Sequence, residues 1–134
     1  MWAMAGVLLF IAGTMLVLHL ATPTTVPWRV ADGKLQIHSK VESDDFPLAD
    51  LQLDRARVVD LNREPGFRPS KKSWGFDGFG YDAGRFVLRG GGSADIYLAG
   101  ENTAVLIPRR GDVPVIVGVS DPRPLISALQ SAGQ

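Results

Sequence analysis

The chain begins with an apolar run that holds no charged side chain. The stretch Trp2–Ala21 contains no Asp, Glu, Lys or Arg, and all 14 basic and 14 acidic residues follow it, the first being Arg29. A helix of this length rises ~30 Å, which is the thickness of the hydrocarbon core of a bilayer. The sequence therefore predicts a transmembrane helix over residues 1–22, a Pro- and Thr-rich linker over 23–27 and one folded domain over 28–134.

The apolar run has a second interpretation, a cleaved signal peptide that precedes an exported soluble β domain. The first six residues carry no basic side chain, and cleavage after Ala21 would put His19 where a small residue is preferred. A retained anchor is therefore favoured. Arg29, Lys34 and Lys40 follow within twenty residues of the run. The positive-inside bias then favours a single-pass protein of the inner (cytoplasmic) membrane with its domain in the cytoplasm.

The composition excludes several classes of function. Acidic and basic residues are equal in number, so the whole chain is not an electrostatic binder of nucleic acid. There is no cysteine, which excludes disulfides and thiolate metal sites. The two histidines, His19 and His38, form no zinc motif, and no nucleophile and base have a recognisable spacing. We expect no catalytic residue, cofactor or metal, and the alternative is a small enzyme that uses buried acids with His38.

After the linker the chain alternates in the manner of an all-β domain. Asp32-Gly33 lies between two alternating segments and predicts a hairpin, because a type I′ turn needs positive φ at both central residues. Asp44-Asp45 is expected in a turn, and Arg63–Ser73, rich in Gly, Pro and Lys, in a long loop. The segments expected to form strands are Trp28–Ala31, Lys34–Lys40, Phe46–Leu53, Arg55–Asn62, Arg85–Arg89, Ala94–Ala99, Ala104–Pro108 and Val113–Val119.

The last segment changes to a helical period. Ser120-Asp121-Pro122 predicts a helix start, with Asp121 as the N-cap and Pro122 at the first helical position. Leu125, Ile126 and Leu129 then fall on one face of a helix that ends near Ser131. One amphipathic helix after many strands favours a small barrel whose open end the helix covers.

Three pieces of the chain combine glycines, aromatic residues and strand ends. They are Gly75–Phe86, with the sequence GFDGFGYDAGRF, Ile107-Pro108, and Val119-Ser120-Asp121-Pro122. From Trp74 to Gln130 the chain resembles the small bacterial pleckstrin-homology-like (PH-like) domains of membrane proteins. The resemblance implies a mainly β fold, a small barrel or sandwich of about seven strands capped by one C-terminal α-helix. It implies architecture rather than chemistry. From the residues of Gly75–Gly84 we expect glycines at tight bends and aromatic side chains in the core, and the alternative is an aromatic lip that contacts a ligand.

A basic cluster carries the candidate binding surface. From Asn62 to Ser73 there are four basic residues and one acid, Glu64, for a local charge of +3 (four minus one). Basic residues beside interfacial aromatic side chains suit an anionic membrane surface, at ~1 kcal/mol per Lys or Arg close to it. The alternative is a solvated loop. We predict a non-catalytic, membrane-anchored domain that presents this surface to membrane lipids, a membrane protein or a second copy of the chain. The candidate residues are Arg63, Phe67, Arg68, Lys71, Lys72 and Trp74.

Overall fold

The computed structural model describes residues 26–38, 43–78 and 80–133, and the predicted anchor lies outside them. Within the described residues no helix is long and apolar enough to cross a membrane. The described chain is mainly β, with one C-terminal α-helix, as predicted. Its elements are β1 (Trp28–Ala31), β2 (Lys34–His38), β3 (Ser43–Pro47), the 3-10 turns η1 (Leu48–Asp50) and η2 (Leu53–Arg55), β4 (Arg57–Asp60), the 3-10 turn η3 (Pro65–Phe67), β5 (Pro69–Gly78), β6 (Tyr81–Leu88), β7 (Ser93–Leu98), β8 (Thr103–Ile107), β9 (Val115–Gly118) and α2 (Arg123–Ala132).

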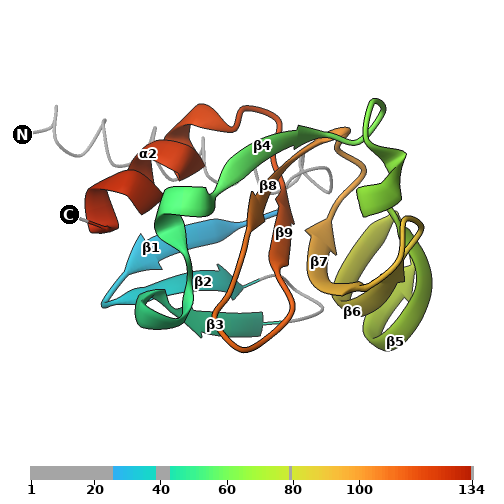
Figure 1. Ribbon diagram of the computed structural model, residues 1–134, viewed down its shortest axis with the longest axis horizontal. Helices are drawn as coiled ribbons and strands as arrows, with labels where there is room; N and C mark the ends of the chain where they lie inside the picture. Colours follow the sequence, from blue (N-terminus) through green and yellow to red (C-terminus); the bar gives the residue numbers. More distant parts are fainter. Residues whose placement is uncertain (1–25, 39–42, 79, 134) are drawn as a thin grey trace, which may run out of the picture.

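The sequence predicts a barrel or a sandwich, and the described strands form two sheets and no closed barrel. One sheet has the order β1-β2-β3, and the other has the order β4-β8-β9-β7-β6-β5 (Figure 1). Neighbouring strands are antiparallel except β7 and β9, which run parallel. β4 and β5 are the two edges of the larger sheet, so each has one side without a described strand partner.

The hairpin predicted at Asp32-Gly33 is confirmed. Ala31 pairs with Lys34 across the turn, and both turn residues have positive φ, 55° at Asp32 and 74° at Gly33. Leu35 and the residue two positions later are fully buried, while the residues between and beside them face outward. The alternation read from the sequence therefore sets which face of β2 meets the core.

The expected turn at Asp44-Asp45 is wrong, because both residues lie within β3. Each acid has a partner on another strand, Asp44 on β7 of the larger sheet and Asp45 on the adjacent β2. The Tyr97 hydroxyl donates to Asp44 Oδ2 at 2.5 Å, and His38 Nε2 lies 2.7 Å from Asp45 Oδ1. These contacts hold two acidic side chains in a strand that local composition alone disfavours.

The expected loop over Arg63–Ser73 is confirmed as far as Arg68 and is wrong beyond it, since β5 begins at Pro69 and pairs with β6. Two glycines that were expected at tight bends lie within these paired strands. Gly75 and Gly84 face each other with φ of 118° and 132°, and a Cβ on Gly75 would lie 2.2 Å from the carbonyl oxygen of Ala83. The two backbones therefore approach more closely than residues with side chains would allow.

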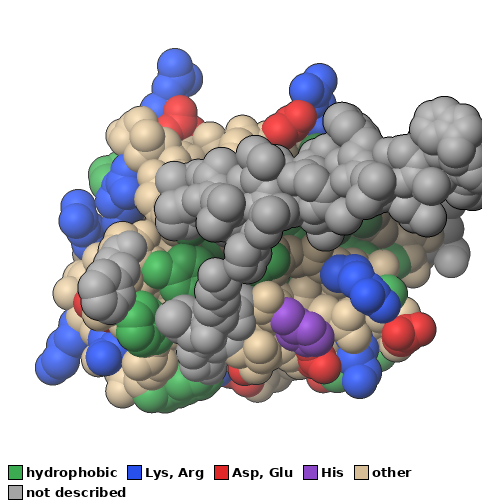
Figure 2. Space-filling view, turned by 180° about the vertical axis from the view of Figure 1, so that it is seen from behind, with side chains coloured by type: hydrophobic (Ala, Val, Ile, Leu, Met, Phe, Trp, Pro, Cys, Tyr) green, Lys and Arg blue, Asp and Glu red, His purple; other side chains and the backbone are tan. Residues whose placement is uncertain are grey.

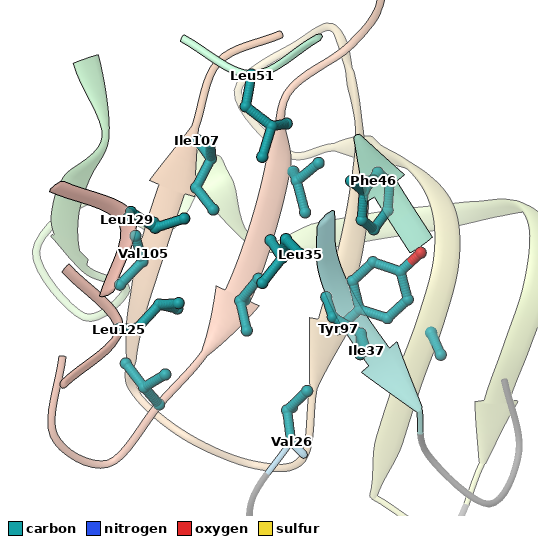
Figure 3. Packing of buried hydrophobic residues seen from close by; sticks show 14 of the residues in the cluster. Val26, Leu35, Ile37, Phe46, Leu51, Tyr97, Val105, Ile107, Leu125 and Leu129 are labelled. Atoms are coloured by element: carbon teal, nitrogen blue, oxygen red, sulfur yellow. The ribbon is translucent and has the colours of Figure 1, made fainter. Parts of the chain in front are cut away.

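A first apolar cluster fills the space between the two sheets and α2 (Figure 3). In α2, Leu125 and Leu129 are fully buried and Ile126 packs partly buried against the cluster, which confirms the predicted apolar face. The Phe46 and Tyr97 rings meet edge to face, with centroids 5.9 Å apart. The helix begins one residue later than predicted, after Pro122. Other members of the first cluster are Val26, Leu35, Ile37, Leu51, Ala83, Ala99, Val105, Ile107, Val115, Val117 and Val119.

A second apolar cluster lies on the larger sheet alone. Its buried members come from β4, β6, β7, β8 and β9, or directly follow β4, and each is no more than 9% exposed. Side chains alternate between the faces of a strand, so these residues occupy the face opposite the first cluster. They are Val59, Leu61, Phe86, Leu88, Ala94, Ile96, Leu98, Ala104, Leu106 and Ile116.

Candidate functional site

A cleft of about 370 Å³ lies beside β5, and it gathers part of the predicted basic cluster. Arg68, just before β5, and Lys71 and Lys72 within it line the cleft, together with Arg89, which directly follows β6. Pairing of β5 with β6 brings Arg89 to the other three cations, although it is far from them in the chain. Lys and Arg side chains gather at this end of the molecule, on the left of Figure 2.

The other three predicted residues are placed elsewhere. Phe67 packs against the second apolar cluster, and the guanidinium carbon of Arg57 lies 5.4 Å from the centre of its ring. Trp74 lies on β5 and is 47% exposed, with the guanidinium carbon of Arg85 5.8 Å from its ring. Arg63 is highly exposed and does not line the cleft. Three of the six candidate residues therefore share one site, and the other three do not.

The cations of the cleft have no carboxylate partner within the described part of the chain. Arg68 donates to two amide oxygens, Asn62 Oδ1 at 3.0 Å and Asn102 Oδ1 at 3.1 Å. Amide oxygens hold the guanidinium in place but leave its charge uncompensated. No ion pair joins Lys71 or Lys72 to a described acid. Positive charge is therefore concentrated at this end of the cleft, which favours the binding of anions.

Acidic side chains line the other end of the same cleft. Asp77 and Asp82 are direct cross-strand partners near the tip of the β5–β6 hairpin. Burial, a hydrogen bond with Asp77 and the charge of Asp77 raise the pKa of Asp82 to about 6. A hydrogen bond between two carboxyl groups requires that one of them keep its proton. Lys72 and Asp77 are five residues apart on one strand, or ~16 Å, so the cleft is polarised along β5.

Glu101 closes the cleft where the loop after β7 returns to the sheet. Burial raises the pKa of its carboxyl, while backbone N–H groups, first that of Ala99 and also that of Val26, act in the opposite direction. The Ala99 N–H donates to Glu101 Oε1 at 2.6 Å. A Cβ on Gly118 would lie 2.5 Å from that same oxygen, so the glycine makes room for the carboxylate.

A separate charged network lies away from the cleft. Asp95, 4% exposed, accepts two hydrogen bonds from Arg85, at 2.8 Å to Oδ1 and 3.1 Å to Oδ2, and one from Arg109 at 2.5 Å. Arg109 also lies over the ring of Phe46, 5.2 Å from its centre. Both carboxylate oxygens are engaged by guanidinium groups, so this buried acid serves to join β6, β7 and the segment after β8.

The alternative prediction, a small enzyme, requires His38 to lie beside buried acids. His38 is exposed on β2 and contacts Asp45 on the adjacent strand, apart from the cleft. Among residues 26–38, 43–78 and 80–133, no group of three or more His, Asp or Glu side chains is placed to hold a metal ion.

Sequence reasoning missed Arg89, the Asp77–Asp82 pair and Glu101. Asp82 lies in β6 and Arg89 directly follows it, and the sequence predicts a loop where the first half of the partner strand β5 lies, so the register of the pair was not predictable. Glu101 stood between Gly100 and Asn102, which is turn composition. Compared with protein-family models, with curated proteins and with solved structures, the chain matches none of them.

Proposed function

We propose that this chain is a membrane-anchored, non-catalytic domain of the PH-like type that holds anionic lipid headgroups in the cleft beside β5. The observation that carries the proposal is the group of four cations, Arg68, Lys71, Lys72 and Arg89, that line one cleft without a described carboxylate partner. Lipid phosphates are the anions that a domain tethered to a bilayer meets first. Each cation near an anionic surface contributes ~1 kcal/mol of attraction.

The position of Val26 supports the same proposal. Val26 lies close enough to Glu101 for its backbone N–H to lower the pKa of that carboxyl, and Glu101 lines the cleft. The apolar run of the predicted anchor ends at Ala21, a few residues earlier. Four or five extended residues span ~17 Å at most. An anchor in the bilayer would therefore hold this cleft near the headgroups.

The order of the elements supports the proposed PH-like type. A series of mostly antiparallel strands followed by one C-terminal helix is the order that the resemblance implies. The helix packs its buried leucines against the first apolar cluster, as a cap does.

The charges within the cleft also support the proposal. The acidic end, with Asp77 and Asp82, repels phosphate and so directs an anion toward the lysines.

The test uses the full chain in nanodiscs, because the chain has no cysteine and a single thiol can be introduced without background. Ser73→Cys places a thiol on β5 next to Lys72, where the native side chain is exposed. We expect an uncharged, bulky maleimide to modify this thiol more slowly in discs that contain phosphatidylglycerol than in pure phosphatidylcholine. Added salt should remove the difference, because it screens exposed charges over ~10 Å at 0.1 M.

Matched variants identify the responsible charges. Lys71→Ala/Lys72→Ala in the Ser73→Cys background should abolish the lipid dependence, whereas Arg63→Ala should leave it, because Arg63 does not line the cleft. Ser131→Cys on α2 provides a thiol that should react equally in both lipids. Equal modification of the β5 thiol in both disc types would refute the proposal.

A further inference from the structure

The described chain covers the second apolar cluster on one side, the side of the larger sheet, and leaves its other side almost without contacts. Within residues 26–38, 43–78 and 80–133, Phe67 of η3 is the one hydrophobic side chain outside the cluster that packs against it. The first cluster, in contrast, has the smaller sheet on one side, the larger sheet on the other and α2 at its margin. Yet side chains at the centre of the second cluster, such as Ile96 and Ile116, are fully buried.

A sheet face of this composition is costly to leave open to water. Its members are aliphatic or aromatic, and a contiguous apolar patch made by five strands exceeds what soluble monomers leave open to water. No polar side chain interrupts the face along β8, where Ala104 and Leu106 alternate with residues of the first cluster. A helix or segment that is apolar on all sides is the natural complement of such a face.

Val26 packs its side chain in the first cluster, while its backbone N–H faces the Glu101 carboxylate. The Glu101 carboxylate, which Val26 approaches through its backbone N–H, fills the space beside Gly118 of β9. On that side of β9 the next residue along is Ile116 of the second cluster, and Leu98 of the same cluster also reaches the Gly118 position, at 2.8 Å from the site of a Cβ. The residues that precede Val26 therefore start within reach of the apolar face.

The apolar N-terminal segment has the length and composition to cover it. Residues 2–21 carry no charge and as a helix would measure ~30 Å, while the six strands of the larger sheet, ~4.8 Å apart, span ~24 Å. Residues 22–25 give a connection of up to ~14 Å, enough to bring the segment back across the strands.

We propose that residues 2–21 of the same chain cover the second apolar face of the six-stranded sheet whenever they are not in a bilayer. The segment then has two alternative apolar environments, its own sheet in water and the lipid in a membrane. Membrane insertion of the segment uncovers the sheet face, so the exposure of this face depends on whether the anchor is inserted. This proposal goes beyond the binding of lipid headgroups in the cleft and does not depend on it.

Disulfide trapping in the full chain tests this directly. One cysteine replaces Ala104, which is fully buried in the second cluster, and a second replaces in turn each residue along one helical turn of the segment, from Leu8 to Ile11. In detergent-free buffer we expect at least one pair to form an intramolecular disulfide, seen as a faster band on a non-reducing gel. The same partners combined with Ala83→Cys should not form one, because Ala83 is equally buried but lies in the first cluster.

The outcomes distinguish the N-terminal segment from a second copy of the chain as the partner of this face. Absence of any intramolecular disulfide overturns the proposal, and so does a covalent dimer formed in its place, which would make a second copy the cover. Thiol protection gives an independent measure, because the single variant Ala104→Cys should be shielded from maleimide in water and react about tenfold faster or more once neutral phosphatidylcholine vesicles take up the segment. The single variant Ala83→Cys should stay shielded in both, which shows that the domain is still folded. Unchanged protection of the Ala104→Cys thiol with vesicle-bound chain also overturns the proposal.

Discussion

Asp77 and Asp82 face each other across the β5–β6 hairpin and share a hydrogen bond, at the end of the cleft away from the lysines. Two carboxyl groups can bond to each other only while one of them is protonated. The pKa of Asp82 is raised from 3.8 to about 6, with burial as the largest cause. The pair therefore links the stability of the hairpin to proton concentration.

The sign of this linkage follows from the folded-state pKa. Between pH 3.8 and about 6 the folded chain keeps the Asp82 proton, whereas the unfolded chain releases it. The stabilisation from this group is complete below 3.8 and is lost as the pH rises through about 6. Asp82→Asn should therefore flatten the fall in unfolding free energy across this window and make the chain more stable than wild type above it. Urea denaturation at several pH values measures this effect, with Asp54→Asn on exposed η2 as the control.

Glu101 and Gly118 should be energetically coupled. A Cβ at position 118 would lie 2.5 Å from Glu101 Oε1 and 2.8 Å from Leu98 Cδ2, so Gly118→Ala must displace the carboxylate from the Ala99 N–H. We expect a loss of ~1–3 kcal/mol in unfolding free energy. In a double-mutant cycle, Glu101→Ala should reduce the cost of Gly118→Ala, because the carboxylate is then absent. Strict additivity of the two changes would contradict the contact.

The docking of α2 gives a prediction for the first cluster. Leu129 is fully buried between the sheets, whereas Ser127 on the same helix is exposed. Leu129→Ala should lower the unfolding free energy by ~2–5 kcal/mol, since it leaves a cavity that the neighbouring strands fill only in part. Ser127→Ala should change it by less than about 0.5 kcal/mol. Chemical denaturation of both variants decides whether the helix contributes to the core.

The elements that could be predicted from the sequence are those with a local cause. Asp32-Gly33 specifies its hairpin because both residues tolerate positive φ, and the spacing of Leu125 and Leu129 specifies a helix face. β5 has no such local signal. Pro69, Lys71 and Lys72 are poor strand formers, and the strand exists because β6 pairs with it, with bulges between Pro69 and Lys71 and between Lys72 and Trp74.

The site was predictable only in part for the same reason. The basic composition of residues 63–72 drew attention to Arg68 and the two lysines, which do share a cleft. The cross-strand partners Asp77 and Asp82, and the added cation Arg89, depend on the register of a hairpin whose first strand resembles a loop in sequence. The cleft forms because segments far apart in the sequence pair with each other, and short-range sequence patterns do not predict such pairing.

The Arg85–Asp95–Arg109 network provides the last prediction. Asp95 is 4% exposed and holds two guanidinium groups, while Asp112, which contacts the same two arginines at 3.2 and 3.5 Å, has a side chain 44% exposed. Asp95→Asn should lower the unfolding free energy by about 3–5 kcal/mol, because it removes the anion that compensates two partly buried cations. Asp112→Asn should cost clearly less, since water solvates the charges on that side. Thermal and urea denaturation of the two variants compare them directly. Equal losses would show that exposure does not decide the strength of this network.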